Sequence, residues 1–176
     1  EDKMQRYLHI PIKNRAVEKL LDPWTPKWEE RYYKLLFHQD VTPAFKTEVC
    51  HNYLEGLEWT MNYYTFHCKD WRWSYHYAYP PLLSDLLIHI PHWDTEMIPK
   101  NTHTPVSHYV QLAYVLPKQS LHLLPEQIYK IIIENLHWYK PDSPIHWAFC
   151  KYFWESHVKM PTIDLDELEQ LIEKIK

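Results

Sequence analysis

Acidic side chains are the first residues of this sequence that could do chemistry. Hydrolysis assisted by two metal ions needs several carboxylates that converge on Mg²⁺ or Mn²⁺. The candidates by position are Glu55, Glu58, Asp70, Asp85 and Asp94. Glu55 and Glu58 stand three residues apart on a predicted helix and could share a site. The sequence offers no pair of acids at strand ends, so we interpret these acids as solvated helix side chains and assign no catalytic residue.

Histidine and cysteine offer a second kind of chemistry. The adjacent pairs Cys50-His51 and His67-Cys68 lack the ligand spacing of structural zinc sites, and a Cys-His nucleophilic pair has no more support. Cys50 falls on an apolar helix face, which favours a place in the core. With 1 glycine in the chain, a glycine-rich phosphate loop is excluded. No metal-binding residue is assigned.

Aromatic side chains offer the third possibility, which is stacking. Rings and positive charges gather in residues 68–81, and they could hold the splayed bases of a single strand at about 1–3 kcal/mol per base. The alternative is that these rings close a hydrophobic core beneath a loop. The candidate binding residues are Lys69, Trp71, Arg72, Trp73, Tyr75 and Tyr77.

Composition limits the classes of protein that the sequence can encode. The 176 residues suit one domain, and the formal net charge of −4 gives no overall basic signature for nucleic acid. Three cysteines without a CxxC motif favour a reducing intracellular compartment, either cytoplasmic or nuclear. No apolar run is long enough for a transmembrane helix, so we expect no membrane contact. The first residue is Glu1, and we expect the sequence to be a fragment of a longer protein.

Apolar periodicity predicts helices over most of the chain. The longest begins at Thr42-Pro43, with Thr42 as N-cap, and its predicted apolar face runs through Val49, Leu57, Met61 and Tyr64. Gly56 lies inside this helix and predicts the close approach of another backbone. Further helices are predicted at residues 15–22, 27–38, 82–90, 106–116, 125–136 and 164–176, where Asp164 is the N-cap of the last. Residues 118–124 are predicted to form a short turn.

Two segments depart from the helical pattern. In residues 68–81 aromatic and polar residues alternate, which predicts an extended segment with its rings on one side. Residues 145–158 are the best candidate for a strand. The predicted fold class is therefore mainly α: one irregular helical domain over residues 1–176, with extended aromatic segments and at most a short strand pair.

These segments resemble a known family. Residues 53–86, YLEGLEWTMNYYTFHCKDWRWSYHYAYPPLLSDL, are similar to the signature Y-x-E-G-L-x-W…Y-Y…C-x-W-x-W-Y-Y-P-Y-H-Y-A-P-x-x-S-D of the 5′→3′ exoribonucleases (the Xrn and Rat1 nucleases). Four other blocks agree in order: ERYYKLLF, QLAYVLP, SPI and the segment 161–171. The resemblance covers roughly residues 28–172.

The resemblance implies a role that the residues alone do not give. The chain corresponds to the end of the second conserved region, the helical half of the nuclease core, which walls the substrate channel. One tryptophan there narrows the opening so that a single strand threads through, and by position either Trp71 or Trp73 matches it. The family's acid cluster, which binds Mg²⁺ or Mn²⁺, lies in the first conserved region and has no counterpart here. We therefore expect this chain alone to be inactive.

The implied partners are single-stranded RNA and the catalytic N-terminal region, in the same or another chain. The complete enzyme would release nucleoside monophosphates from 5′-monophosphorylated RNA. Residues 76–81 depart from the family pattern, since Ala78 replaces its histidine; this indicates a divergent member, and a viral or protistan source would fit. The alternative is a non-catalytic module of the same fold with a structural or protein-binding role.

Overall fold

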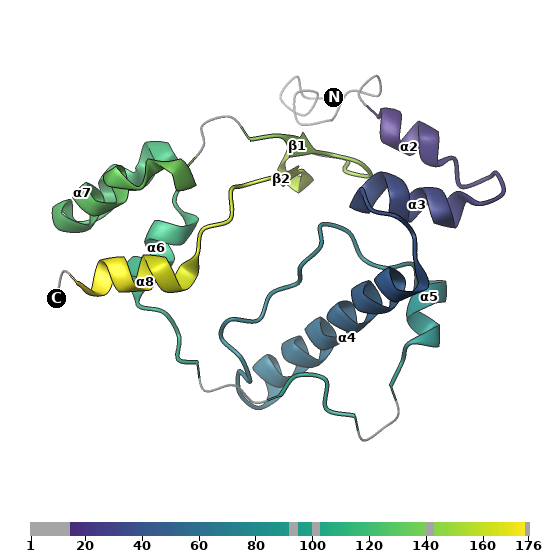
Figure 1. Ribbon diagram of the computed structural model, residues 1–176, viewed down its shortest axis with the longest axis horizontal. Helices are drawn as coiled ribbons and strands as arrows, with labels where there is room; N and C mark the ends of the chain where they lie inside the picture. Colours follow the sequence, from purple (N-terminus) through teal and green to yellow (C-terminus); the bar gives the residue numbers. More distant parts are fainter. Residues whose placement is uncertain (1–14, 92–94, 100–102, 140–142, 175–176) are drawn as a thin grey trace, which may run out of the picture. The chain divides into compact units, whose positions relative to one another are not determined.

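The computed structural model describes residues 15–91, 95–99, 103–139 and 143–174, and within them the chain is mainly helical, as predicted (Figure 1). The α-helices are α2 (Ala16–Leu21), α3 (Trp28–Phe37), α4 (Pro43–Thr65), α5 (Leu83–Ile88), α6 (His108–Val115), α7 (Glu126–Glu134) and α8 (Leu165–Glu173). The 3₁₀ helices are η2 (Lys118–Leu123), η3 (Leu136–Trp138) and η4 (Phe153–Glu155), and the strands are β1 (Ile145–His146) and β2 (His157–Val158).

The chain divides into two compact units. Unit 1 comprises residues 1–104 and 147–155, and unit 2 comprises residues 105–146 and 156–176. Each unit has its own buried clusters, so each is described by itself. The single domain expected from the length stays a prediction.

Helix α4 is the longest element of unit 1 and begins where the sequence predicts. The Thr42 hydroxyl accepts a hydrogen bond from the Phe45 amide, and Pro43 occupies the first turn, where its missing N–H costs nothing. Phe45 and Val49 are buried with Tyr33 of α3 in one aromatic cluster. The N-terminal half of α4 is therefore a core helix.

The C-terminal half of α4 differs from the prediction. Leu57, Met61 and Tyr64, expected on the buried face, are 52%, 63% and 80% exposed. The face that is covered instead carries Asn52, Gly56 and Trp59. The apolar periodicity predicted the wrong buried face, because a segment rich in aromatic and polar groups, not an aliphatic core, packs against this half of α4.

Tyr33 joins three helices of unit 1. Its hydroxyl donates to Asp85 of α5 at 2.7 Å and accepts from the Leu82 amide at 3.1 Å. Lys46 of α4 reaches the same Asp85 carboxylate at 3.0 Å and lies 4.8 Å from the centre of the Tyr33 ring. Burial and the Asp85 carboxylate raise the pKa of Tyr33, so the hydroxyl keeps the proton it donates.

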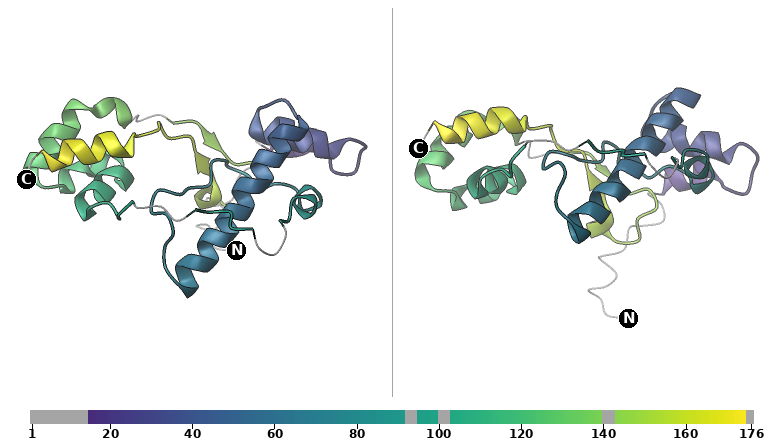
Figure 2. Two further views of the ribbon diagram at one scale, coloured as in Figure 1. Left: turned by 60° about the horizontal axis from the view of Figure 1, so that its bottom comes forward. Right: turned by 90° about the horizontal axis from the view of Figure 1, so that it is seen from below.

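Unit 2 is a small helical bundle (Figure 2), and its core is mostly aliphatic. Its buried residues are Val110, Ala113, Leu121, Leu124, Ile128, Ile132, Trp138, Tyr139, Ile163, Leu168 and Ile172. The Asp164 carboxylate accepts from the amides of Asp166 and Glu167, as expected for the predicted cap of α8. Helix α6 begins at His108, two residues later than predicted, because Ser107 caps it by accepting a hydrogen bond from the Val110 amide.

The predicted strand at residues 145–158 was wrong as a continuous strand. The segment forms two-residue strands that pair antiparallel, with Ile145 opposite Val158 and His146 opposite His157. Residues 147–155 form a loop between them that includes η4. Within the residues that the structure describes, no helix has the length and apolar character needed to cross a membrane.

Candidate nucleic-acid interface

Residues 68–81, here called the aromatic strap, run back beside α4 (Figure 1) and hold all six predicted binding residues. Over these residues, all of which the structure describes, the backbone forms neither helix nor strand, and it makes a turn at residues 71 and 72. Such backbone needs partners for its amides and carbonyls. Side chains of α4 supply two of them.

Asn52 and Trp59 tie the strap to the helix. The buried Asn52 accepts a hydrogen bond from the His76 amide at 2.9 Å and donates to Glu55 at 3.0 Å. The Trp59 indole N–H donates to the Asp70 carbonyl at 2.7 Å. Sequence reasoning missed both anchoring roles, although the spacing of Asn52, Gly56, Trp59 and Tyr63 places all four on one helix face.

Gly56 is a packing position, as predicted, but its partner is a side chain and not a backbone. A Cβ added at Gly56 would lie 2.6 Å from Cη2 and 3.2 Å from Cζ2 of Trp73. The absence of a side chain therefore lets the Trp73 indole lie against the helix. Its Nε1 also approaches Glu55 Oε2 at a long 3.5 Å.

Four rings continue from this point as a ladder. Trp73 stacks on Trp59 at 5.8 Å between ring centres, Trp59 stacks on Tyr63 at 5.1 Å, and Tyr63 meets Trp71 edge to face at 6.3 Å. Trp73 is half-buried, whereas Trp71 is 45% exposed. The geometry therefore separates the two tryptophans that the sequence could not: Trp73 packs against the helix, and Trp71 stands at the exposed end.

Tyr75 and Tyr77 of the strap pack against unit 1. The Tyr75 hydroxyl donates to the Tyr79 carbonyl at 2.7 Å, and its ring meets Tyr53 edge to face. Tyr77 contacts Phe37 and Phe45 in the core cluster. Burial raises the pKa of both tyrosines, so their hydroxyls stay protonated at neutral pH.

Lys69 is engaged in an ion-pair network. Its Nζ lies 2.8 Å from Glu58 Oε1 and 2.7 Å from Glu96 Oε1, and 14% of the side chain is exposed. The second Glu58 oxygen accepts from the Met97 amide at 2.8 Å. The hydrogen bonds that Lys69 donates to the two glutamates raise its pKa. This network, called the Glu58 latch below, joins the strap to residues 95–99.

The same latch explains the ionisation of Glu58. Burial disfavours its charged form, but hydrogen bonds from Lys69 and the Met97 amide, together with the Lys69 charge, outweigh burial and lower the pKa of Glu58.

Asp70 also binds groups of unit 1, since its Oδ1 accepts a hydrogen bond from the Arg72 amide at 2.8 Å and lies 3.6 Å from His103 Nδ1. The Arg72 side chain is half-buried.

The candidate acids are therefore structural rather than solvated, which corrects that part of the sequence interpretation. Glu55, Glu58, Asp70 and Asp85 each bind a side chain or an amide of unit 1. Asp94 lies outside the described residues. Among the described residues, no three His, Cys, Asp or Glu side chains come close enough together to hold a metal ion.

Cys50 is buried, as predicted for a core residue, and burial raises the pKa of its thiol to about 11. Such a thiol stays protonated and unreactive at neutral pH. Cys150 is also buried, and Cys68 is half-buried. The cysteines thus agree with a packing role.

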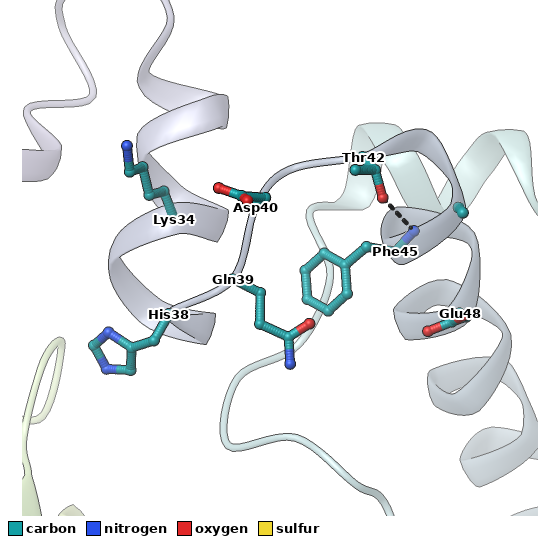
Figure 3. Close-up of a pocket in the computed structure, with 8 residues that line it drawn as sticks. Lys34, His38, Gln39, Asp40, Thr42, Phe45 and Glu48 are labelled. Carbon is teal, nitrogen blue, oxygen red and sulfur yellow. Dashed lines mark hydrogen bonds between the residues drawn. The ribbon is translucent and has the colours of Figure 1, made fainter.

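A pocket of about 760 Å³ lies at the connection between α3 and α4 (Figure 3). Lys34, His38 and Asp40 line one side of it, and Thr42 and Glu48 belong to the start of α4. None of the six predicted binding residues is among the described side chains that line this pocket. It is therefore separate from the aromatic strap.

Comparison with known proteins agrees with the resemblance read from the sequence. The family described as Xrn1 helical domain matches residues 13–176. The chain is 33% identical over 152 residues to 5'-3' exoribonuclease 2 of Saccharomyces cerevisiae, covering 81% of this chain and 14% of that protein. It is 32% identical over 146 residues to the protein of the same name from Emericella nidulans, covering 80% and 14%. For the Gallus gallus protein of that name the identity is 30% over 159 residues, covering 86% and 16%. The chain thus spans about one-seventh of the length of these relatives.

Proposed function

Because the chain belongs to the Xrn1 helical domain family, we propose that it forms a helical wall of the substrate channel of a 5′→3′ exoribonuclease. The complete enzyme degrades 5′-monophosphorylated single-stranded RNA to nucleoside monophosphates. The other part of the assembly is the catalytic N-terminal region, in the same or another chain. We place the protein inside the cell, in the cytoplasm or the nucleus.

The exposed end of the ring ladder is the observation that carries this proposal. Trp71 presents a partly exposed indole that meets the Tyr63 ring edge to face, and the Glu58 latch holds Lys69 two residues before it. Ring faces stack on any base, and a single strand leaves its bases free to stack. Trp71 is thus the residue we propose to contact RNA, while Trp73, Tyr75 and Tyr77 position the strap.

Metal chemistry is assigned to the other part of the enzyme. Mg²⁺ or Mn²⁺ would supply an activated water for attack on the first phosphodiester. The acids described here are committed to Lys69, Lys46, Asn52 and backbone amides, and they do not form a ligand set. This chain, given Mg²⁺ and 5′-phosphorylated RNA, should release no mononucleotides, and their release would contradict this division of roles.

A pair of substitutions tests the assignment of Trp71. Trp71→Ala should weaken binding of a fluorescent single-stranded oligoribonucleotide by about 1–3 kcal/mol and leave the melting temperature nearly unchanged. Trp73→Ala should instead destabilise the fold by about 3 kcal/mol, because it empties the space over Gly56. Trp24→Ala is the matched control, since Trp24 is 92% exposed and lies outside the strap. Equal RNA affinity for wild type and Trp71→Ala would refute the assignment.

The alternative function is a non-catalytic module derived from the same fold. The observation that favours it is the exposed apolar face of α4, formed by Leu57, Met61 and Tyr64, which would suit contact with another protein. The coding sequence upstream of Glu1 discriminates between the two. An acid cluster with a nearby basic helix would support the nuclease, and a stretch without clustered acids would support the module.

A further inference from the structure

The loop 147–155 is fixed near its start by hydrogen bonds with two side chains: Glu18 of α2, and Arg15, the residue before α2. Glu18 accepts a hydrogen bond from the Phe149 amide at 2.6 Å, and Arg15 donates to the Cys150 carbonyl at 2.6 Å. These bonds hold Phe149 at φ 62°, a left-handed conformation that residues other than glycine adopt rarely. The loop is thus held in an unfavourable backbone conformation by side chains distant in sequence.

The far side of the loop is closed by Glu155. Its Oε2 accepts from the amide of Lys151 at 2.7 Å and from the amide of Tyr152 at 3.2 Å. Ala148 at the base is buried with Leu36, and the Tyr79 hydroxyl donates weakly to the Ala148 carbonyl at 3.4 Å. Tyr79 is the last ring of the aromatic strap, so the loop and the strap share one buried contact within unit 1.

This loop presents an exposed aromatic ring, that of Trp154, stacked on a second ring, that of Tyr152. The rings of Tyr152 and Trp154 stack at 5.5 Å between centres with 10° between their planes, and Trp154 is 72% exposed. Lys151 places its Nζ 5.0 Å from the centre of the Tyr152 ring. Lys151, Tyr152 and Trp154 together are called the loop platform below.

We propose that the loop platform is a second stacking site for a base of single-stranded RNA. The proposal rests on the proposed function in taking RNA as the ligand. A parallel pair of rings offers a face to a base of any kind, and the adjacent ammonium suits a phosphate. The shared contact through Tyr79 and Ala148 favours RNA over a protein ligand, because it joins the platform to the segment already proposed to meet RNA.

Substitution of Trp154 provides the test. Trp154→Ala should weaken binding of a fluorescein-labelled 12-nucleotide oligouridylate by about fivefold to a hundredfold, the range expected for one lost stack. Trp154→Phe keeps a ring and should restore most of the affinity. Trp24→Ala should bind as wild type does. Equal affinity of wild type and Trp154→Ala would overturn the proposal and leave the platform for contact with a protein.

Lys151 gives a second, independent variant at an exposed position. Lys151→Glu should weaken binding and reduce its dependence on salt, because one phosphate contact is lost. An unchanged affinity and salt slope would also overturn the proposal. If Trp71→Ala weakens binding while Trp154→Ala and Lys151→Glu do not, the platform is wrong and the proposed function stands; the reverse pattern refutes Trp71 alone.

Discussion

Unit 1 and unit 2 are each stabilised internally by a different kind of contact. The core of unit 2 is mostly aliphatic and comes from short helices that meet on their apolar faces. Unit 1 has two small clusters built around Tyr33 and around Leu36 and Tyr79, and much of its order comes from ring contacts and from hydrogen bonds to the strap. One unit relies on buried area, and the other relies on directed contacts.

The two kinds of contact differ in whether they fix the orientation of a surface side chain. Aliphatic packing is non-directional, and it stabilises a scaffold without fixing any surface side chain. Edge-to-face and stacked rings have preferred geometries, so a ladder of them can hold Trp71 in one orientation. The cost is that single anchors, such as Asn52 and Glu58, each carry a large share of the order in unit 1.

The largest expected effect tests the aliphatic side of this comparison. Leu168 is fully buried, and Leu168→Ala should lower the free energy of unfolding by about 2–5 kcal/mol, through lost burial and the cavity left behind. Urea denaturation measures this. Leu123→Ala, at a 68% exposed leucine of the same unit, should change stability by less than about 0.5 kcal/mol. Equal losses in the two variants would mean that unit 2 does not rest on this core.

The Glu58 latch gives a smaller and pH-dependent effect. Glu58→Gln should cost about 1.5–3 kcal/mol at pH 7, since it removes the charge that Lys69 and the Met97 amide bind. Folding lowers the pKa of Glu58 below its ordinary value of 4.5. The stabilisation is therefore fully present above pH 4.5 and is lost as the pH falls through the lowered pKa of the folded state. Wild type and Glu58→Gln should therefore converge in stability on acidification to well below pH 4.5, as followed by urea denaturation at each pH.

The exposed pair Lys130–Glu126 in unit 2 serves as its control. Both side chains are at least 70% exposed, and Glu126→Gln should cost less than about 1 kcal/mol at any pH. A constant difference between wild type and Glu58→Gln from pH 7 to pH 3 would contradict the role given to the latch.

The smallest expected effect is that of Gly56→Ala on stability. It is the most specific test, because its sign should depend on whether Trp73 is present. Gly56→Ala adds a methyl group 2.6 Å from Trp73 Cη2, and the cost of about 1–3 kcal/mol should exceed the gain of about 1 kcal/mol from helix propensity. In a Trp73→Ala background the same change should stabilise the protein, because the clash is gone. Thermal unfolding of the four proteins gives this double-mutant cycle. Stabilisation by Gly56→Ala in both backgrounds would show that Trp73 does not need the glycine.

Local patterns predicted most of the helices. Thr42-Pro43 and Asp164 are caps whose chemistry acts within one turn, and the helix at residues 27–38 was found as α3, Trp28–Phe37. Asp164 and Thr42 accept the expected amide hydrogen bonds. Such features need no knowledge of distant residues, which is why periodicity and capping sufficed for them.

Contacts between distant segments were the part that the sequence did not give. Trp73, which fills the space over Gly56, lies seventeen positions later in the chain. It belongs to a strap that has no regular secondary structure. Glu58, Asp70 and Asp85 looked like solvated acids because their partners Lys69, His103 and Lys46 come from other segments. For the same reason the strand predicted at residues 145–158 was wrong: Glu18 and Glu155 fold that stretch into a loop.

Photocrosslinking tests the central claim most directly, namely that the strap offers Trp71 to single-stranded RNA while Trp73 packs on the helix. The chain would be irradiated with an oligonucleotide that carries 4-thiouridine, digested, and the modified residues mapped by mass spectrometry. We expect a nucleotide adduct on Trp71 and none on Trp73, and this adduct should be abolished by an excess of unlabelled single strand and unaffected by duplex. A map in which Trp73 is modified and Trp71 is not would contradict it.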